Sequence, residues 1–267
     1  MDERTNIFPV PEIIEEYLSN VADQIDSRGL EPSLGSPGSI ELQSEEFYSF
    51  ISDAYSLGNI QLEIAADHLY SFNRSISPPI LTIAPWASVR MLLESCSISA
   101  WLFEPNIPIE ERCTRSYALR TKSLREHVKF CRSANAMDAL SEAEEILDRV
   151  SADAERLGET IVFPSVTDLV SQQLDAQVAY RLCSAMLHGH HWAVQKLGFS
   201  SVKNEGDTLL GKYISPGAIR YLIDTSISSF HLAIDRKFLL YGWERKEIIE
   251  NKNKTLQRLE VVFGMLP

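Results

Sequence analysis

Two polar residues in a largely apolar stretch of the chain have side chains that could do chemistry together. Arg181 and His188 lie seven residues apart in the segment 175–191. On a helix this spacing is two turns, about 10 Å of rise, and the two side chains leave within roughly 20° of each other. A histidine can move a proton near neutral pH, and an arginine holds an anion with its permanent charge. The pair is therefore the first candidate for a site.

The segment that carries this pair has the pattern of a buried central helix. Leu174, Val178, Leu182 and Ala185 recur at offsets of three and four residues, and further apolar residues spread over the remaining circumference. A helix that is apolar nearly all round is expected inside a protein. The pattern ends at Gly189, a residue that accepts the left-handed backbone found just past a helix end.

Apolar periodicity predicts helices along most of the chain, with serine caps and proline or glycine stops at many of their ends. The expected helices span residues 11–26, 44–76, 85–103, 109–133, 141–157, 165–173, 175–188, 215–242 and 243–262. Ser44, Ser141, Ser165 and Ser215 are the expected caps. The sequence predicts an all-α protein, an up-down bundle of about seven to eight helices, with one small β-hairpin near residues 192–212.

The N-terminal part differs from the rest in composition. Residues 1–46 hold 11 acidic and two basic residues, a net charge of -9 out of the total of -12. Residues 28–44 are rich in glycine, proline and serine, which is typical of a linker. The sequence therefore predicts an acidic N-terminal helix plus linker at 1–44, as an appendage, and one bundle domain at 45–267. The charge of that domain is close to neutral and excludes no class of partner.

Several classes of protein are excluded by what the sequence lacks. It has no apolar run long enough to span a membrane, and its first residues lack the basic and then apolar order of a secretory signal. We therefore expect a cytoplasmic protein that has no membrane partner. It contains no phosphate-binding glycine loop, zinc helix or nucleophile elbow. The cysteines stand singly among apolar residues and are expected to be reduced core thiols: Cys96, Cys113, Cys131 and Cys183.

Three histidines close together raise the question of a metal. His188, His190 and His191 surround the expected helix end, but no cysteine or carboxylate lies close in sequence to complete a ligand set. A metal site needs three or four converging ligands. The sequence predicts neither a metal nor another cofactor.

The expected helix at 109–133 has a basic stripe opposite its apolar side. The stripe consists of Arg115, Lys122, Arg125, Lys129 and Arg132. One interpretation is a solvated outer face, and the other is a surface that contacts an anion or a nucleic acid.

The run Tyr-Arg-Leu-Cys-Ser-Ala-Met-Leu-His-Gly, from Tyr180 to Gly189, resembles the signature of the HEPN superfamily, helical-bundle proteins many of which are metal-independent endoribonucleases. The resemblance implies a HEPN-like core over about residues 80–240, a site at the cleft of a homodimer and RNA as substrate. It also implies a toxin or antiphage-defence role with a cognate antitoxin or regulatory partner. Arg181 and His188 would be catalytic, and Tyr180 and Ser184 would contact substrate or orient the imidazole. The stripe residues Arg115, Lys122, Arg125 and Lys129 would guide the RNA.

The same residues allow a second interpretation without catalysis. Arg181 would pair with a carboxylate of a neighbouring helix, Glu94 being the nearest candidate by pattern, and His188 would cap its helix end. The protein would then be a non-catalytic interaction or ligand-binding protein. Arg120 and His127 form another pair at the same spacing, but they lie in a highly charged segment. An Arg181 locked to Glu94 in a dry core favours the structural interpretation, and an intact pair in a solvent-reached cleft, with no carboxylate within reach of Arg181, favours the enzyme.

Overall fold

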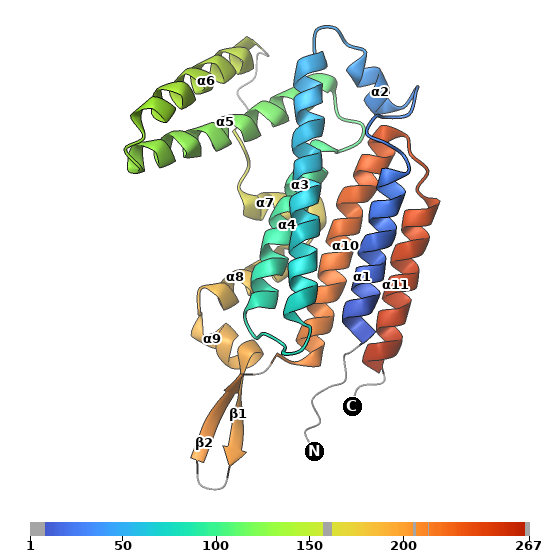
Figure 1. Cartoon of the computed structure of the whole chain (residues 1–267), viewed down its shortest axis with the longest axis vertical. Helices are drawn as coiled ribbons and strands as arrows, with labels where there is room; N and C mark the ends of the chain where they lie inside the picture. The colour runs from blue at the N-terminus through green and yellow to red at the C-terminus, as the bar shows by residue number, and fades with distance from the viewer. Residues whose placement is uncertain (1–8, 157–161, 205–206, 213, 265–267) are drawn as a thin grey trace.

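The computed structural model describes residues 9–156, 162–204, 207–212 and 214–264. Its helices are α1 (Pro9–Asp26), α2 (Pro37–Leu42), α3 (Tyr48–Ser75), α4 (Ala84–Leu102), α5 (Ile109–Ser133), α6 (Met137–Arg156), α7 (Val166–Leu174), α8 (Gln177–Leu187), α9 (His191–Ala193), α10 (Pro216–Tyr241) and α11 (Lys246–Gly264). The long helices form a bundle from which α5 and α6 project as an arm (Figure 1). The prediction of an all-α helical bundle is confirmed.

The centre of the bundle is α4. It packs against α3 and α10 on its long sides and against α7 and α8 on its flank. Most of its apolar side chains are buried, among them Trp86, Val89, Leu92 and Cys96, whereas Met91 is exposed. A helix in contact with four others must be apolar over most of its circumference, and α4 meets that requirement.

The helix predicted to be central, at 175–188, is instead a short flanking helix. The chain breaks it from α7 at Asp175, whose backbone is left-handed with φ 51°. The remaining α8 has 11 residues and turns one side toward α4, while Val178 on its other side is 68% exposed. The apolar residues all round this segment therefore do not indicate burial all round.

Local signals set several helix ends as the sequence predicts. Ser215 caps α10, because its Oγ accepts the N–H of Ala218 at 3.1 Å, and Gly242 ends the helix with φ 66°. Two predicted starts are wrong. The helix α3 begins at Tyr48 rather than at Ser44, and α6 begins at Met137, so the expected cap Ser141 lies inside it.

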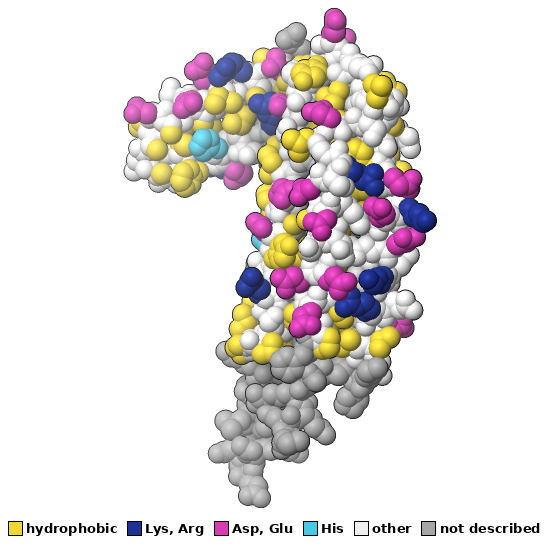
Figure 2. All heavy atoms as spheres, turned by 45° about the vertical axis from the view of Figure 1, so that its right-hand side comes forward, with side chains coloured by type: hydrophobic (Ala, Val, Ile, Leu, Met, Phe, Trp, Pro, Cys, Tyr) yellow, Lys and Arg dark blue, Asp and Glu magenta, His cyan; other side chains and the backbone are white. Residues whose placement is uncertain are grey.

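The acidic N-terminal helix is part of the bundle and not an appendage. Val10, Ile14 and Tyr17 of α1 are fully buried in the same core as α3, α4 and α10. Glu16 faces α11, where Arg258 lies 2.5 Å away and Lys254 lies 3.7 Å away. The hydrogen bond from Arg258 is the main cause of the lowered pKa of Glu16. The cations of α11 therefore compensate the acidic charge of α1, and Figure 2 shows both signs interspersed over that side.

The predicted linker at 28–44 is also ordered, and it contains α2. Ser36 caps this helix by accepting the N–H of Ser39 at 3.1 Å. Gly38 approaches the bundle so closely that an added Cβ would lie 3.0 Å from the carbonyl oxygen of Leu240. Glycine, proline and serine thus form a tight turn and a helix cap in this segment. The prediction of a linker, which was based on this composition, is wrong.

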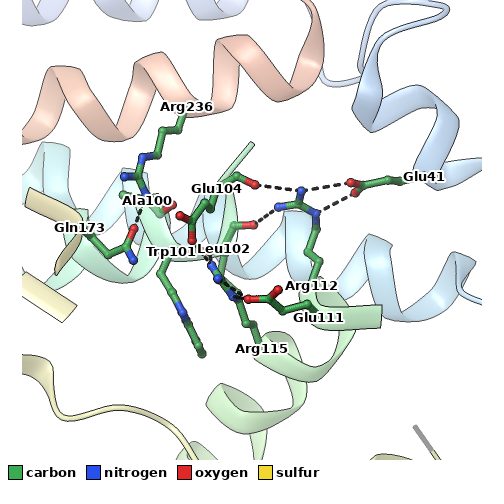
Figure 3. A network of polar contacts seen from close by, with 10 residues as sticks. All are labelled: Glu41, Ala100, Trp101, Leu102, Glu104, Glu111, Arg112, Arg115, Gln173 and Arg236. Carbon is green, nitrogen blue, oxygen red and sulfur yellow. Dashed lines mark hydrogen bonds and ion pairs between the residues drawn. The ribbon is translucent and has the colours of Figure 1, made fainter. Parts of the chain in front are cut away.

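Three arginines meet the C-terminal end of α4 (Figure 3). The last carbonyls of a helix have no partners within it. Arg236 donates to the carbonyl of Ala100 at 2.8 Å, Arg115 to that of Trp101 at 2.6 Å and Arg112 to that of Leu102 at 2.5 Å.

Carboxylates balance the charge of two of these guanidinium groups, those of Arg112 and Arg115, whereas Arg236 donates to the side-chain amide of Gln173. Arg112 is fully buried, and both oxygens of Glu41 in α2 accept its N–H groups at 2.8 and 3.1 Å. Arg115 donates at 2.5 Å to Glu104 and at 2.5 Å to Glu111. The cluster ties α2, α4, α5 and α10 together at one end of the bundle.

A two-stranded antiparallel hairpin follows α9 and a π-helical turn, η1 (Val194–Gly198). Its strands are β1 (Phe199–Asn204) and β2 (Asp207–Lys212), paired with Phe199 opposite Lys212 and Asn204 opposite Asp207. It lies in the span for which the sequence predicts a hairpin. The four cysteines are all free and buried, as expected. Within the described residues, no helix has the length and apolar character needed to cross a membrane.

Replacing the buried guanidinium of Arg112 should destabilise the protein strongly. Arg112→Leu leaves Glu41 with only the hydroxyl of Tyr55 as a donor and takes the guanidinium donors away from two carbonyl groups, and we expect the free energy of unfolding to fall by about 3–5 kcal/mol. Arg112→Lys keeps the charge without the fork and should recover only part of this loss. The measurement is urea denaturation. Arg132→Leu removes an exposed ion pair with Glu144 and should cost about 0–1 kcal/mol. Equal losses in the two leucine variants would contradict the role given to Arg112.

A buried histidine should make stability depend on pH. His231 in α10 is 7% exposed and its Nδ1 has no hydrogen bond within the described structure. Burial is the main cause of a pKa lowered to about 4, with Lys252 and Arg245 also lowering it and Asp235 opposing them. As the pH falls, the unfolded chain therefore binds a proton at this histidine before the folded protein does. The contribution of neutral His231 to stability is fully present above about pH 6.5 and is lost as the pH falls toward 4.

Comparing pH 7 with pH 5 tests this linkage. The pKa difference predicts that His231 costs about 2 kcal/mol of unfolding free energy at pH 5. His231→Leu should remove that part of the pH dependence in urea denaturation. His127→Leu, on the exposed side of α5, controls for the loss of one histidine. A pH dependence that is the same in wild type and His231→Leu would refute the assignment.

Candidate functional site

Helix α8 presents Arg181 on its outward side. Ala179, Tyr180, Cys183 and Met186 are buried and face the bundle, while Arg181 is exposed. Burial raises the pKa of the Cys183 thiol to about 12. The inward side of the helix therefore holds apolar and uncharged groups, and its cation points into solvent.

The end of α8 fixes the place of His188. The N–H of Gly189, whose φ is 64°, donates to the carbonyl of Met186 at 3.2 Å, and the N–H of His190 donates to that of Ala185 at 2.9 Å. These two bonds form a Schellman motif, in which glycine takes the left-handed position as the sequence predicts. His188 is the last residue before this turn and its side chain is exposed. The ring of His190 lies 6.3 Å from the ring of His188.

Glu94, the proposed carboxylate partner of Arg181, is occupied by other groups. The hydroxyl of Tyr180 donates to Glu94 Oε1 at 2.9 Å, and Arg90 Nε lies 3.2 Å from the same oxygen. The guanidinium of Arg90 also covers the Tyr180 ring at 5.3 Å and donates to its hydroxyl at 3.4 Å. These contacts join α8 to α4. Among the described residues, Arg181 has neither a hydrogen bond nor an ion pair.

Ser184 and Tyr180, the two residues of α8 predicted to assist Arg181 and His188, differ in burial and in their contacts. Ser184 lies half-buried one turn before His188, and its carbonyl accepts the His188 N–H at 3.0 Å. Tyr180 lies on the inward side, where burial is the main cause of its raised pKa. Its hydroxyl is a structural contact between helices, so the structure does not bring it together with Arg181 and His188.

The basic stripe of α5 is shorter than the sequence predicts. Arg115 is only 8% exposed, and its guanidinium is bound to Glu104 and Glu111 and lies 5.3 Å from the ring centroid of Trp101. It is therefore a core residue and not part of an accessible surface. The wheel pattern missed this because α5 joins the bundle at its N-terminal half and leaves it at its C-terminal half (Figure 1).

The outer part of the stripe lines a hollow in the arm. Lys122, Arg125 and Lys129 surround it together with apolar groups of α5, α6 and the segment at 162–163, and its volume is about 680 Å³. Lys122 lies 4.1 Å from the ring centroid of Phe163, and Lys129 is paired with Glu126 at 2.7 Å. This hollow lies on the α5–α6 arm and does not include α8.

The second arginine–histidine pair has a structural explanation. The guanidinium of Arg120 is bound to Asp53 of α3 and lies 5.9 Å from the ring centroid of Tyr117. His127 is exposed farther along α5. The two pairs have the same spacing in sequence but differ in structure. Arg120 is paired with a carboxylate, whereas Arg181 has no carboxylate partner among the described residues.

The described residues contain no group of three or more histidine, cysteine, aspartate or glutamate side chains placed to hold a metal ion. Comparison of the chain with models of protein families, with curated proteins and with solved structures finds no match. The described residues form an all-α bundle with an exposed arginine–histidine pair on a flanking helix.

The contact of Tyr180 with Glu94 gives a stability prediction. Tyr180→Phe removes the hydroxyl and should lower the free energy of unfolding by about 1 kcal/mol, the usual contribution of such a hydrogen bond. The measurement is urea denaturation. Tyr70→Phe is the control, since Tyr70 lies 39% exposed on α3, and it should change stability by less than about 0.5 kcal/mol. A hydroxyl free to bind substrate would instead leave both variants as stable as the parent.

Proposed function

We propose that this chain is a metal-independent endoribonuclease in which Arg181 and His188 act on one phosphodiester. The observation that carries the proposal is their joint exposure on the outward side of α8 while Glu94 is bound by Tyr180 and Arg90. An exposed arginine without a carboxylate is available to an anion. The resemblance of the run from Tyr180 to Gly189 to the HEPN signature supports the same reading.

The reaction that fits these two groups is transesterification at a ribose. Neutral His188 accepts the proton of the 2′-hydroxyl, the 2′-oxygen bonds to phosphorus, and the bond from phosphorus to the 5′-oxygen breaks. Water protonates the leaving oxygen, so the products are a 2′,3′-cyclic phosphate and a 5′-hydroxyl. Arg181 holds the phosphate and the charge that develops on its oxygens. Both roles are filled by side chains, so the step needs no metal.

A second copy of the chain would complete the surface. Val178 lies on the outward side of α8 near Arg181 and is 68% exposed, so a second copy that covered the pair would also cover this valine. A homodimer would place two such pairs beside each other and form a cleft for RNA. A toxin or antiphage-defence role with a regulatory partner belongs to the same proposal.

A non-catalytic binding role is the second candidate. The hollow of about 680 Å³ in the arm combines cations with apolar lining, which suits a bound partner and lies away from the pair. In that case Arg181 and His188 would contribute to binding or solubility only. The experiment below separates the two roles, because only the first predicts broken RNA.

RNA cleavage is the direct test. The purified chain is incubated with mixed RNA in the presence of a chelator, and cyclic-phosphate ends are quantified. His188→Ala should reduce the rate by about 10²–10⁴-fold and Arg181→Ala by about 10²–10³-fold. Arg181→Lys should restore little, because the planar fork is lost.

Arg120→Ala and His127→Ala are the matched controls, since they remove the other pair at the same spacing. Both should leave the rate unchanged. Intact RNA at high protein concentration would reject the ribonuclease proposal, and cleavage that survives both Arg181→Ala and His188→Ala would assign the activity to a different site or a contaminant.

A further inference from the structure

The segment around α8 has an unusual charge. Residues 176–198 contain no aspartate and no glutamate, although the whole chain has a net charge of -12. The same residues include Arg181, Lys196 and three of the six histidines. Lys196 is exposed in η1, like Arg181 in α8. Glu94 of α4 contacts this segment through Tyr180, but it is paired with Arg90, so the segment itself favours an anion more than the overall composition suggests.

The same segment carries several exposed rings. His188, His190, His191 and Trp192 follow one another across the turn after α8, and all four side chains are exposed. Trp192 is 51% exposed, whereas Trp86, Trp101 and Trp243 are exposed by 5% or less. The tryptophan at this turn is thus the one whose ring is open to solvent.

The turn holds Trp192 in a defined position. The carbonyl of His190 accepts the N–H groups of Ala193 at 2.9 Å and Val194 at 3.0 Å, and His190 is itself bonded to Ala185 of α8. Ala193 is fully buried in the main core. The backbone that carries the exposed ring is therefore fixed by its neighbours, which limits the conformational freedom that the main chain loses when the ring binds a flat partner.

We infer that the substrate is single-stranded RNA and that Trp192 stacks on a base near the phosphate held by Arg181. The inference rests on the proposed ribonuclease function and names its substrate class. Bases of a single strand are free to stack on aromatic side chains, whereas those of a duplex are already stacked on one another. Arg181 and Lys196 supply the cations for the backbone, and the segment 176–198 that carries them contains no acidic residue of its own.

Tryptophan fluorescence tests the contact directly. The protein carries His188→Ala to prevent cleavage, and the probe is a short single-stranded oligouridylate. Because the other three tryptophans are buried, quenching by RNA reports on Trp192. We expect quenching by the single strand, much weaker quenching by the same length of duplex with oligoadenylate, and no RNA-dependent quenching in Trp192→Phe.

Affinity provides the second readout, from the anisotropy of a labelled oligouridylate. Trp192→Ala should weaken binding by about tenfold or more, and Trp192→Phe should retain most of the affinity, since a ring is kept. Phe130→Ala is the matched control, an exposed aromatic residue on the α5–α6 arm, and it should leave binding unchanged. Unquenched emission with RNA bound, or equal affinity for the duplex, would overturn the inference.

The two proposals fail in different ways. Cleavage that depends on Arg181 and His188 but is unaffected by Trp192→Ala would keep the ribonuclease and reject the stacking role. Quenching by single-stranded RNA without any cleavage by the parent protein would reject the ribonuclease and leave a single-strand binding surface.

Discussion

The structure depends on the hydrogen bonds that the last carbonyl groups of α4 accept. A buried helix end leaves carbonyl groups without partners and a partial negative charge. The N–H of Phe103 takes the carbonyl of Ser99, and the next three carbonyls are taken by Arg236, Arg115 and Arg112. Arg112 and Arg115 come from α5 and Arg236 comes from α10, so the end of α4 is joined to both of these helices. The carboxylate of Glu41 makes this possible, since a buried cation such as Arg112 needs a counter-charge.

The flank of α4 positions the candidate site in turn. Arg90 and Glu94 lie on adjacent turns of α4 and hold the hydroxyl and the ring of Tyr180. This fixes the rotation of α8, and a neighbouring residue on a helix is turned by about 100°. With Tyr180 drawn inward, Arg181 points outward. The side chain that could bind an anion is thus free because a different arginine satisfies the nearby carboxylate.

Charge is compensated locally at two helix pairs, α1 with α11 and α5 with α6. The acidic α1 lies against the cations of α11, with Glu16 beside Arg258, and the arm pairs basic α5 with acidic α6 through Arg132 and Glu144. A net charge of -12 therefore describes no single surface. The segment 176–198 departs from this pattern because it contains cations and histidines without any acidic residue. That contrast sets α8 and its C-terminal turn apart from the stripe on α5.

The sequence by itself determined the helical class, most helix limits, the reduced cysteines and the glycine stop at Gly189, because these depend on periodicity and on local backbone preferences. Only the tertiary structure decided that α4 is central, that residues 28–44 contain a docked helix, that Arg115 is buried and that Arg181 is not paired with Glu94. The spacing of apolar residues shows which side of a helix is apolar, but it does not show how many neighbouring helices will cover that side. It also does not show which of several arginines reaches a given carboxylate. Those outcomes depend on contacts between residues far apart in the chain, such as Arg112 with Glu41 and Tyr180 with Glu94.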